Sequence, residues 1–236
     1  MLSGIWDTLL YNPLVNLLAF LVSIAPGGDV GLAIIALTIL VKLVLYPLSQ
    51  RSLESQGKMT LLSPELEKIK KSGLSKEEQA AQTFELYRQH KTNPFSGCLL
   101  VVIQIPIILA LYYVFLKGIK FDNGVLYSFI HAPDKMNMLF LGLVDISQKN
   151  LVLALLAGAS QYFQAYFMPK PAAPAGGGAG SFGESFNKSM HMQMKYIFPI
   201  IVAFIAYSVS GAIALYWITS NVFSIAQQIY ANKKSN

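Results

Sequence analysis

Long hydrophobic runs alternate with polar segments along this chain, and the runs approach the length that crosses a bilayer as a helix. They predict five spans, at about residues 30–48, 95–116, 151–168, 196–208 and 212–230. The first 29 residues are also apolar, but Asp7, Asn12, Pro13 and Asn16 interrupt them, which favours a helix lying at the membrane interface. The pattern predicts an all-α integral membrane protein with five transmembrane helices and an N-terminal interfacial helix.

The longest polar segment, residues 49–93, separates the first two spans and predicts a helical hairpin outside the bilayer. Ser63, which precedes Pro64 and Glu65, has the pattern of a helix N-cap. Ser75 and Glu78 have the spacing of a capping box, which opens the second helix of the hairpin. Within the predicted core, residues 30–231, the Pro- and Gly-rich segment 169–190 is expected to be a flexible linker, and residues 232–236 form a short tail.

Composition and charge support a membrane location and indicate an orientation. The chain is 54% hydrophobic and only 13% charged, whereas soluble domains carry about 25% charged residues. The net charge of +6 is compatible with nucleic-acid binding, but the positive-inside rule explains the basic excess more simply. Placing the hairpin, the whole segment 169–195 with its linker, and the tail in the cytoplasm puts thirteen Lys and Arg residues inside and four outside. The N-terminus is therefore expected outside and the C-terminus inside.

Lys42 is the unusual residue of the first span, because a charge at membrane depth is costly and normally faces a protein interior or a water-filled cavity. Thr38, Tyr46 and Ser49 recur at helical spacing around it and form one polar stripe. Two interpretations remain open. Lys42 either snorkels to the headgroups or acts as a functional cation in a cavity.

Polar residues recur on the other spans and bear on that choice. They are Gln104 on the second span, Gln161 and Gln164 on the third, and Trp217, Ser220, Asn221, Ser224, Gln227 and Gln228 on the fifth. Each one alone is explained as a contact between helices, worth ~0.6 kcal/mol on average. Together they favour a shared hydrated cavity that opens toward the cytoplasm.

Catalytic and metal chemistry find little support in the sequence. The nucleophile-elbow, zinc-protease and P-loop motifs are absent, and the spans hold no pair of acidic residues. His90, His131 and His191 fall in three separate segments outside the spans, and Cys98 is the single cysteine. We therefore expect neither an enzyme nor a cofactor or metal site.

Four stretches carry a resemblance to a known family. Residues 93–115, NPFSGCLLVVIQIPIILALYYVF, resemble the signature of the YidC family of membrane protein insertases. Residues 46–59 (YPLSQRSLESQGKM), 192–200 (MQMKYIFPI) and 215–228 (LYWITSNVFSIAQQ) resemble the same family in the same order. The resemblance implies a five-span core with a cytoplasmic hairpin. It also implies a cationic groove in the inner leaflet that is open to lipid and cytoplasm and closed outside.

The resemblance also implies roles for individual residues. Lys42 stands where the family usually has an arginine, and the groove glutamine of the third span maps to Gln161 or Gln164. The groove aromatic of the last span maps to Trp217, with Tyr216 adjacent. The polar faces of the spans add Thr38, Gln104, Ser220, Asn221 and Ser224 to the predicted groove.

The function that follows from the resemblance is insertion of membrane proteins in the bacterial cytoplasmic membrane. The implied partners are nascent membrane proteins and the lipid bilayer, with the Sec translocon and the ribosome as further candidates. No specific nucleic-acid binding is expected. The alternative is a channel or small-solute transporter, although the sequence shows no inverted repeat of the kind many transporters have.

Overall fold

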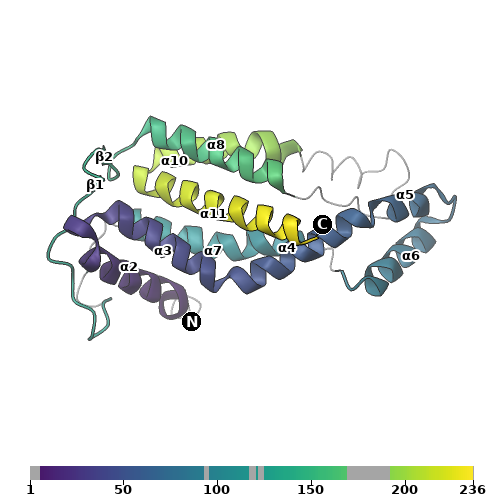
Figure 1. Ribbon diagram of the computed structural model, residues 1–236, viewed down its shortest axis with the longest axis horizontal. Coiled ribbons are helices and arrows are strands. Elements are labelled where there is room, and N and C mark those ends of the chain that lie inside the picture. Colours follow the sequence, from purple (N-terminus) through teal and green to yellow (C-terminus); the bar gives the residue numbers. More distant parts are fainter. Residues whose placement is uncertain (1–5, 93–95, 117–120, 122–124, 169–191, 236) are drawn as a thin grey trace.

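The fold is an elongated bundle of helices, seen from the side in Figure 1. The computed structural model describes residues 6–92, 96–116, 121, 125–168 and 192–235, of which residues 96–103, 115–116, 232 and 234–235 are described by their backbone only. The predicted linker 169–190, His191 and the Asn93–Pro94 break lie outside the described residues. The helical fold class is confirmed.

The helices and strands follow one another with short connections. Their bounds are η1 Asp7–Tyr11, α2 Asn12–Ile24, η2 Pro26–Gly28, α3 Val30–Val44, α4 Tyr46–Leu61, α5 Ser63–Lys71, α6 Lys76–Gln89, α7 Ser96–Leu116, β1 Leu139–Phe140, β2 Val144–Asp145, α8 Leu151–Phe167, η3 Gln193–Ile197, α10 Phe198–Ser208 and α11 Gly211–Ser235. The short antiparallel pair β1–β2 was not predicted from the sequence. It lies within an apolar loop at the end of the bundle opposite α5 and α6 (Figure 1).

The N-terminal helix α2 packs into the bundle against α3. Its Leu18 and Val22 are fully buried and belong to the main hydrophobic core. Asn16, one of the polar residues that favoured an interfacial position, is buried at 3% exposure. Its side chain donates to the carbonyl of Val125 at 2.9 Å and accepts from the amide of Tyr127 at 2.7 Å. The polarity of this residue is therefore explained by a tertiary contact.

Asn16 thus contacts one end of the loop 125–141, and a second buried polar residue, Asp29, contacts its other end. One carboxylate oxygen caps α3 by accepting from the amide of Leu32 at 3.1 Å. The other oxygen accepts from the amide of Leu141 at 2.8 Å. Backbone bonds between Gly28 and Val30 on one side and Asn137 on the other complete the attachment. Asn16 and Asp29 thus hold the 125–141 loop across the end of α2 and α3.

The first predicted span is bent. α3 ends at Val44, and α4 continues from Tyr46 at an angle of 62°. Pro47 lies at the start of α4, where its ring has no N–H to donate to the preceding turn, so the α3 ladder is not continued through it. The span expected to reach residue 48 therefore turns at Leu45, and the first arm of the hairpin begins at this bend.

The hairpin has a small core of its own. It consists of Met59, Leu62, Leu66, Leu86 and Tyr87, with Ile69 packed against it. The predicted capping box is present, because the Glu78 amide donates to the Ser75 hydroxyl and the Ser75 amide donates to the Glu78 carboxylate. The predicted Ser63 cap is wrong. The cap position of α5 is Leu62, and no side chain caps this helix.

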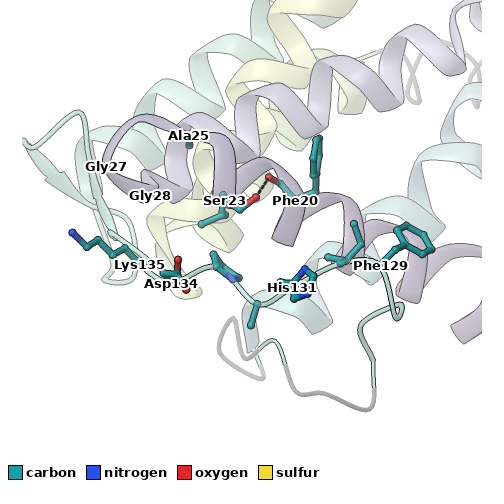
Figure 2. Close-up of a pocket in the computed structure, with 13 residues that line it drawn as sticks. Phe20, Ser23, Ala25, Gly27, Gly28, Phe129, His131, Asp134 and Lys135 are labelled. Carbon is teal, nitrogen blue, oxygen red and sulfur yellow. Dashed lines mark hydrogen bonds between the residues drawn. The ribbon is translucent and has the colours of Figure 1, made fainter.

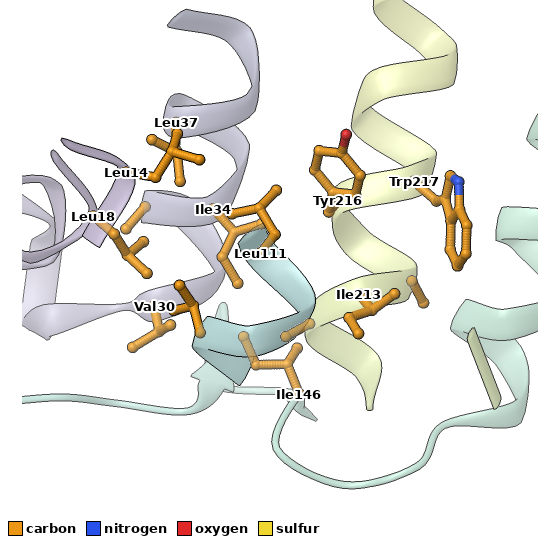
Figure 3. Packing of buried hydrophobic residues seen from close by; sticks show 14 of the residues in the cluster. Leu14, Leu18, Val30, Ile34, Leu37, Leu111, Ile146, Ile213, Tyr216 and Trp217 are labelled. Atoms are coloured by element: carbon orange, nitrogen blue, oxygen red, sulfur yellow. The ribbon is translucent and has the colours of Figure 1, made fainter. Parts of the chain in front are cut away.

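The remaining helices converge on α11. α8 packs closely on both α10 and α11, and α3 packs on the other side of α11 (Figure 1). A Cβ built on Gly158 of α8 would lie 2.9 Å from the Cβ of Ala203, so glycine permits the close approach of α8 and α10. Figure 3 shows the apolar core that fills the space between α2, α3, α7 and α11.

Much of the bundle surface is apolar. Exposed large hydrophobic side chains are frequent on α3, α7, α8 and α10, and they include Val44, Leu109, Leu155, Ile200 and Phe204. By length and apolar composition, one helix of the described residues, Asp7–Ile24, could cross a membrane alone, and the bent pair α3–α4 passes the same test together. Shorter apolar helices cover 104–114, 151–167 and 193–208.

The small core of the hairpin predicts low local stability. Amide hydrogen exchange of α5 and α6 should be much faster than that of α8, because few buried apolar contacts hold the hairpin together. Leu66, at 2% exposure, is the most buried member of this core. Leu66→Ala should lower the free energy of unfolding of the hairpin by ~2–5 kcal/mol and raise amide exchange in residues 63–90 further.

Hydrogen–deuterium exchange followed by mass spectrometry measures the exchange rates of the hairpin and of α8 directly. Leu61→Ala is the matched control, since Leu61 is 73% exposed and its loss should leave exchange unchanged. Protection of the hairpin equal to that of α8 in the wild type would contradict the expectation.

Candidate functional site

Lys42 lies on the last turn of α3 and is bound by residues of two other helices. Its ammonium Nζ donates to the side-chain oxygen of Gln104 on α7 at 3.5 Å and to the hydroxyl of Ser224 on α11 at 3.1 Å. The side chain is half-buried. One cation therefore connects α3, α7 and α11 at the same level of the bundle.

Tyr216 holds Gln104 in the orientation that Lys42 requires. The side-chain amide of Gln104 donates to the hydroxyl of Tyr216, which is buried at 4% exposure. Since the amide nitrogen faces Tyr216, the amide oxygen of Gln104 is left to accept from Lys42. We call Lys42, Gln104, Tyr216 and Ser224 the Lys42 cluster.

A second polar contact joins the same face of α11 to α4, beyond the bend between α3 and α4. The side-chain amide of Gln227 donates to the hydroxyl of Ser49 on α4 at 2.7 Å. Ser49 was part of the polar stripe predicted around Lys42, and Gln227 belongs to the predicted face of the last span. Polar contacts therefore run along one side of α11 from Tyr216 to Gln227.

The other predicted polar residues gather on a different side of α11. Asn221 donates to the hydroxyl of Ser160 on α8 at 3.0 Å, and Gln161 donates to Gln164 within α8 at 2.8 Å. The sequence analysis missed Ser160, although its position next to Gln161 was a usable signal.

Two further predicted residues do not join the Lys42 cluster. The hydroxyl of Thr38 donates to the carbonyl of Ile34 within α3 at 2.7 Å. Trp217 belongs to the hydrophobic core, and Figure 3 shows it on the opposite side of α11 from Tyr216. Consecutive helical residues differ by about 100° in direction, so the pair Tyr216–Trp217 divides between two sides of the helix.

The packing of α3 changes just before Lys42. Its buried residues are Val30, Gly31, Ala33, Ile34, Leu37 and Thr38, and all of them precede Lys42. After Thr38 most of the large apolar side chains are exposed, with Leu43 at 52% and Val44 at 76%, while Val41 is partly buried against the core. Lys42 therefore follows the last fully buried residue of α3, and its side chain is half-buried between three helices.

Neutral groups solvate the charge of Lys42. In the part of the chain that the structure describes, the ion pairs are Lys71–Glu67 and Arg88–Glu85, and both lie on the surface of the hairpin. Lys42 thus has polar acceptors but no carboxylate among the described residues. An ammonium group in this state can still attract an anionic group that comes within reach of it.

Metal binding finds no support in the same ranges, since no group of three His, Cys, Asp or Glu side chains comes together in the described residues. A pocket of ≈ 590 Å³ lies elsewhere, at the end of α2 (Figure 2). Its walls include Phe20, Gly28, Phe129 and His131. It does not adjoin the Lys42 cluster.

The fold and this site define a class: a helical membrane protein with a polar, cation-centred site between its helices. The chain belongs to the family described as 60Kd inner membrane protein, whose sequence profile matches residues 20–236. This match and the three relatives that follow confirm the resemblance to the YidC family.

Three relatives illustrate the match, and each is named "Membrane protein insertase YidC". The protein of Fusobacterium nucleatum is 35% identical over 95% of this chain and 98% of its own length. The protein of Oleidesulfovibrio alaskensis is 34% identical over 98% of this chain, which covers 39% of the relative. The protein of Francisella tularensis subsp. novicida is 34% identical over 85% of this chain and 32% of its own length. The chain thus spans nearly all of the first relative and less than half of the other two.

The Lys42 cluster predicts energetic coupling between α3 and α11. A double-mutant cycle of Lys42→Met and Ser224→Ala, measured by denaturant unfolding in micelles, should give a coupling of at least ~0.6 kcal/mol, the average for such bonds between membrane helices. The control cycle pairs Lys42→Met with Asn221→Ala, because Asn221 bonds to α8 instead. Additive effects of Lys42 and Ser224 would show that the observed bond contributes nothing to stability.

Proposed function

We propose that this chain is a membrane protein insertase, in which Lys42 receives the hydrophilic segment of a substrate. The observation that carries the proposal is Lys42 itself, held by Gln104 and Ser224 where α3 leaves the core and without a carboxylate partner among the described residues. The names of the relatives support the same function.

The mechanism follows from the charge and from the polar side of α11. Polar side chains between Tyr216 and Gln227 provide hydrogen-bonding partners at membrane depth, so a polar substrate segment has less hydrocarbon to cross. Lys42 attracts acidic residues of that segment, and the attraction is stronger than in water because the surroundings have a low dielectric constant. The apolar segment of the substrate then moves sideways into lipid, driven by burial of its own apolar surface. No nucleotide hydrolysis is required.

The proposed arrangement in the membrane has five spans, with the N-terminus outside and the hairpin, the linker and the C-terminus in the cytoplasm. The spans are built on α3, α7, α8, η3–α10 and α11, whose outward side chains are largely apolar. The excess of Lys and Arg in the proposed cytoplasmic segments supports this orientation. In it, the Lys42 cluster lies toward the cytoplasmic side, and the loop held by Asn16 and Asp29 closes the outer side.

Charge at position 42 should decide insertion of acidic substrates. Lys42→Arg should retain activity, Lys42→Ala should reduce insertion of a substrate with an acidic translocated tail, and Lys42→Glu should reduce it further. A neutral tail should be affected less, because Coulomb attraction does not act on it. The measurement is protease protection of the translocated tail in reconstituted vesicles at matched protein levels.

Lys233→Ala is the control, since it removes an exposed lysine at the end of α11. Equal insertion of the acidic tail by the wild type and by Lys42→Ala would show that Lys42 only snorkels.

The proposed orientation is tested by thiol labelling in intact cells. In a Cys98→Ser background, Ser72→Cys on the hairpin and a cysteine in the glycine run 176–180 should react only with membrane-permeant reagents. Asp134→Cys, on the loop at the opposite end, should react with an impermeant reagent, because Asp134 is exposed. Labelling of Ser72→Cys from outside would reverse the orientation.

A further inference from the structure

Lys195 lies among three tyrosine rings at the edge of the bundle, apart from the Lys42 cluster. Its Nζ is 5.1 Å from the ring centroid of Tyr166, 5.4 Å from that of Tyr196 and 6.0 Å from that of Tyr162. The rings of Tyr162 and Tyr196 also contact each other, at 6.1 Å between centroids. Tyr162 and Tyr166 are one turn apart on α8, and Lys195 and Tyr196 belong to η3.

We call Lys195, Tyr162, Tyr166 and Tyr196 the cage. It lies at the end of the apolar part of the bundle. α8 ends at Phe167, and η3 leads directly into the apolar helix α10. Figure 1 shows α8 and α10 at one edge of the bundle, with no further helix outside α8 in this view. The tyrosines are accessible there, with Tyr166 at 60% and Tyr196 at 52% exposure.

The cage adjoins an exposed apolar surface on α8 and α10. Exposed apolar side chains continue from it along α8 and α10, and they include Phe163, Ile197, Ile200 and Phe204. Neither α8 nor η3 nor α10 contains an acidic residue, and in the described ranges Lys195 forms no ion pair. A cation thus lies at the boundary of an apolar surface without a carboxylate partner among the described residues.

We propose that the cage of Lys195, Tyr162, Tyr166 and Tyr196 binds the phosphate of an anionic phospholipid headgroup in the cytoplasmic leaflet. The ring faces hold the ammonium group in place through cation–π attraction. The N–H groups of Lys195 that point away from the rings donate to phosphate oxygens, and the tyrosine hydroxyls provide further donors. The acyl chains lie along the exposed apolar side chains of α8 and α10. This site is separate from the Lys42 cluster and does not depend on the proposed insertion mechanism, and its assignment to the cytoplasmic leaflet rests on the proposed orientation.

The test measures which lipids remain bound to the full-length chain. The protein is reconstituted in nanodiscs that contain phosphatidylglycerol and phosphatidylcholine, released into the gas phase, and analysed by native mass spectrometry. The wild type should retain phosphatidylglycerol in preference to phosphatidylcholine. Lys195→Gln should lower this preference about fivefold, the effect expected of one lysine near an anionic membrane surface.

Matched variants separate the cage from general charge attraction. Tyr166→Leu should lower the preference because it removes the ring nearest the ammonium group, whereas Tyr166→Phe should keep at least half of it. Lys233→Gln removes a lysine of α11 outside the cage and should leave the preference unchanged. Equal losses for Lys195→Gln and Lys233→Gln would overturn the proposal, as would an unchanged preference in Lys195→Gln. Thermal unfolding of each variant in the same nanodiscs shows that it is folded.

Two further arms identify what the cage binds. Excess inorganic phosphate should not displace phosphatidylglycerol, because the acyl chains contribute to binding; displacement would mean a site for a free anion. Glu184→Gln, which removes the one carboxylate of residues 169–191, should leave lipid retention unchanged. A rise in retention would mean that Glu184 occupies Lys195 in the wild type, and it would overturn the proposal.

Discussion

A cation inside a helical membrane bundle must be solvated by the protein, and this constraint organises the structure around Lys42. The ammonium group is held by Gln104 of α7 and Ser224 of α11, and Tyr216 fixes the amide of Gln104. Three helices are therefore tied at one level by neutral acceptors. Neutral acceptors solvate the charge without cancelling it, and an anionic group can still be attracted to the site.

The two ends of the bundle differ in their packing, and this difference determines where the Lys42 cluster lies. Near β1 and β2, the helices are closed by the loop that Asn16 and Asp29 hold, and Val30, Ile34 and Leu37 pack in an apolar core. Beyond Thr38 the core ends on α3, and polar contacts to α11 begin. Under the proposed orientation, this gives a closed outer half and a polar inner half, as insertion from the cytoplasm requires.

The sequence predicted the features that depend on local pattern. Helical spacing around Lys42, together with polar residues on other spans, pointed to Gln104 and Ser224, and the Ser75–Glu78 spacing predicted the capping box. The sequence could not divide the polar residues of α11 between two neighbours, because that depends on how α3 and α8 pack against it. Asn16 was interpreted as interfacial, since its two partners lie about a hundred residues away along the chain.

Other differences have equally local causes. Pro47 was recognised only as part of a motif, whereas in the structure it begins α4 just after the bend at Leu45. Ser63 precedes a proline and has the composition of a cap, yet it lies inside α5 because α4 leads almost directly into it. Where a helix begins or bends depends on the neighbouring elements, and residue spacing alone does not predict it.

The central claim is that the Lys42 side of α11 receives the acidic segment of a substrate. Photo-crosslinking from α11 to a ribosome-stalled substrate tests it most directly, with probes at Ser224, which bonds Lys42, and at Val222, which is exposed and about 200° away around the helix. An acidic tail should crosslink more strongly from position 224 than from position 222, and neutralising the tail or introducing Lys42→Ala should remove the difference. Equal crosslinking from both positions, or a preference that is insensitive to the charge of the tail, would contradict the account.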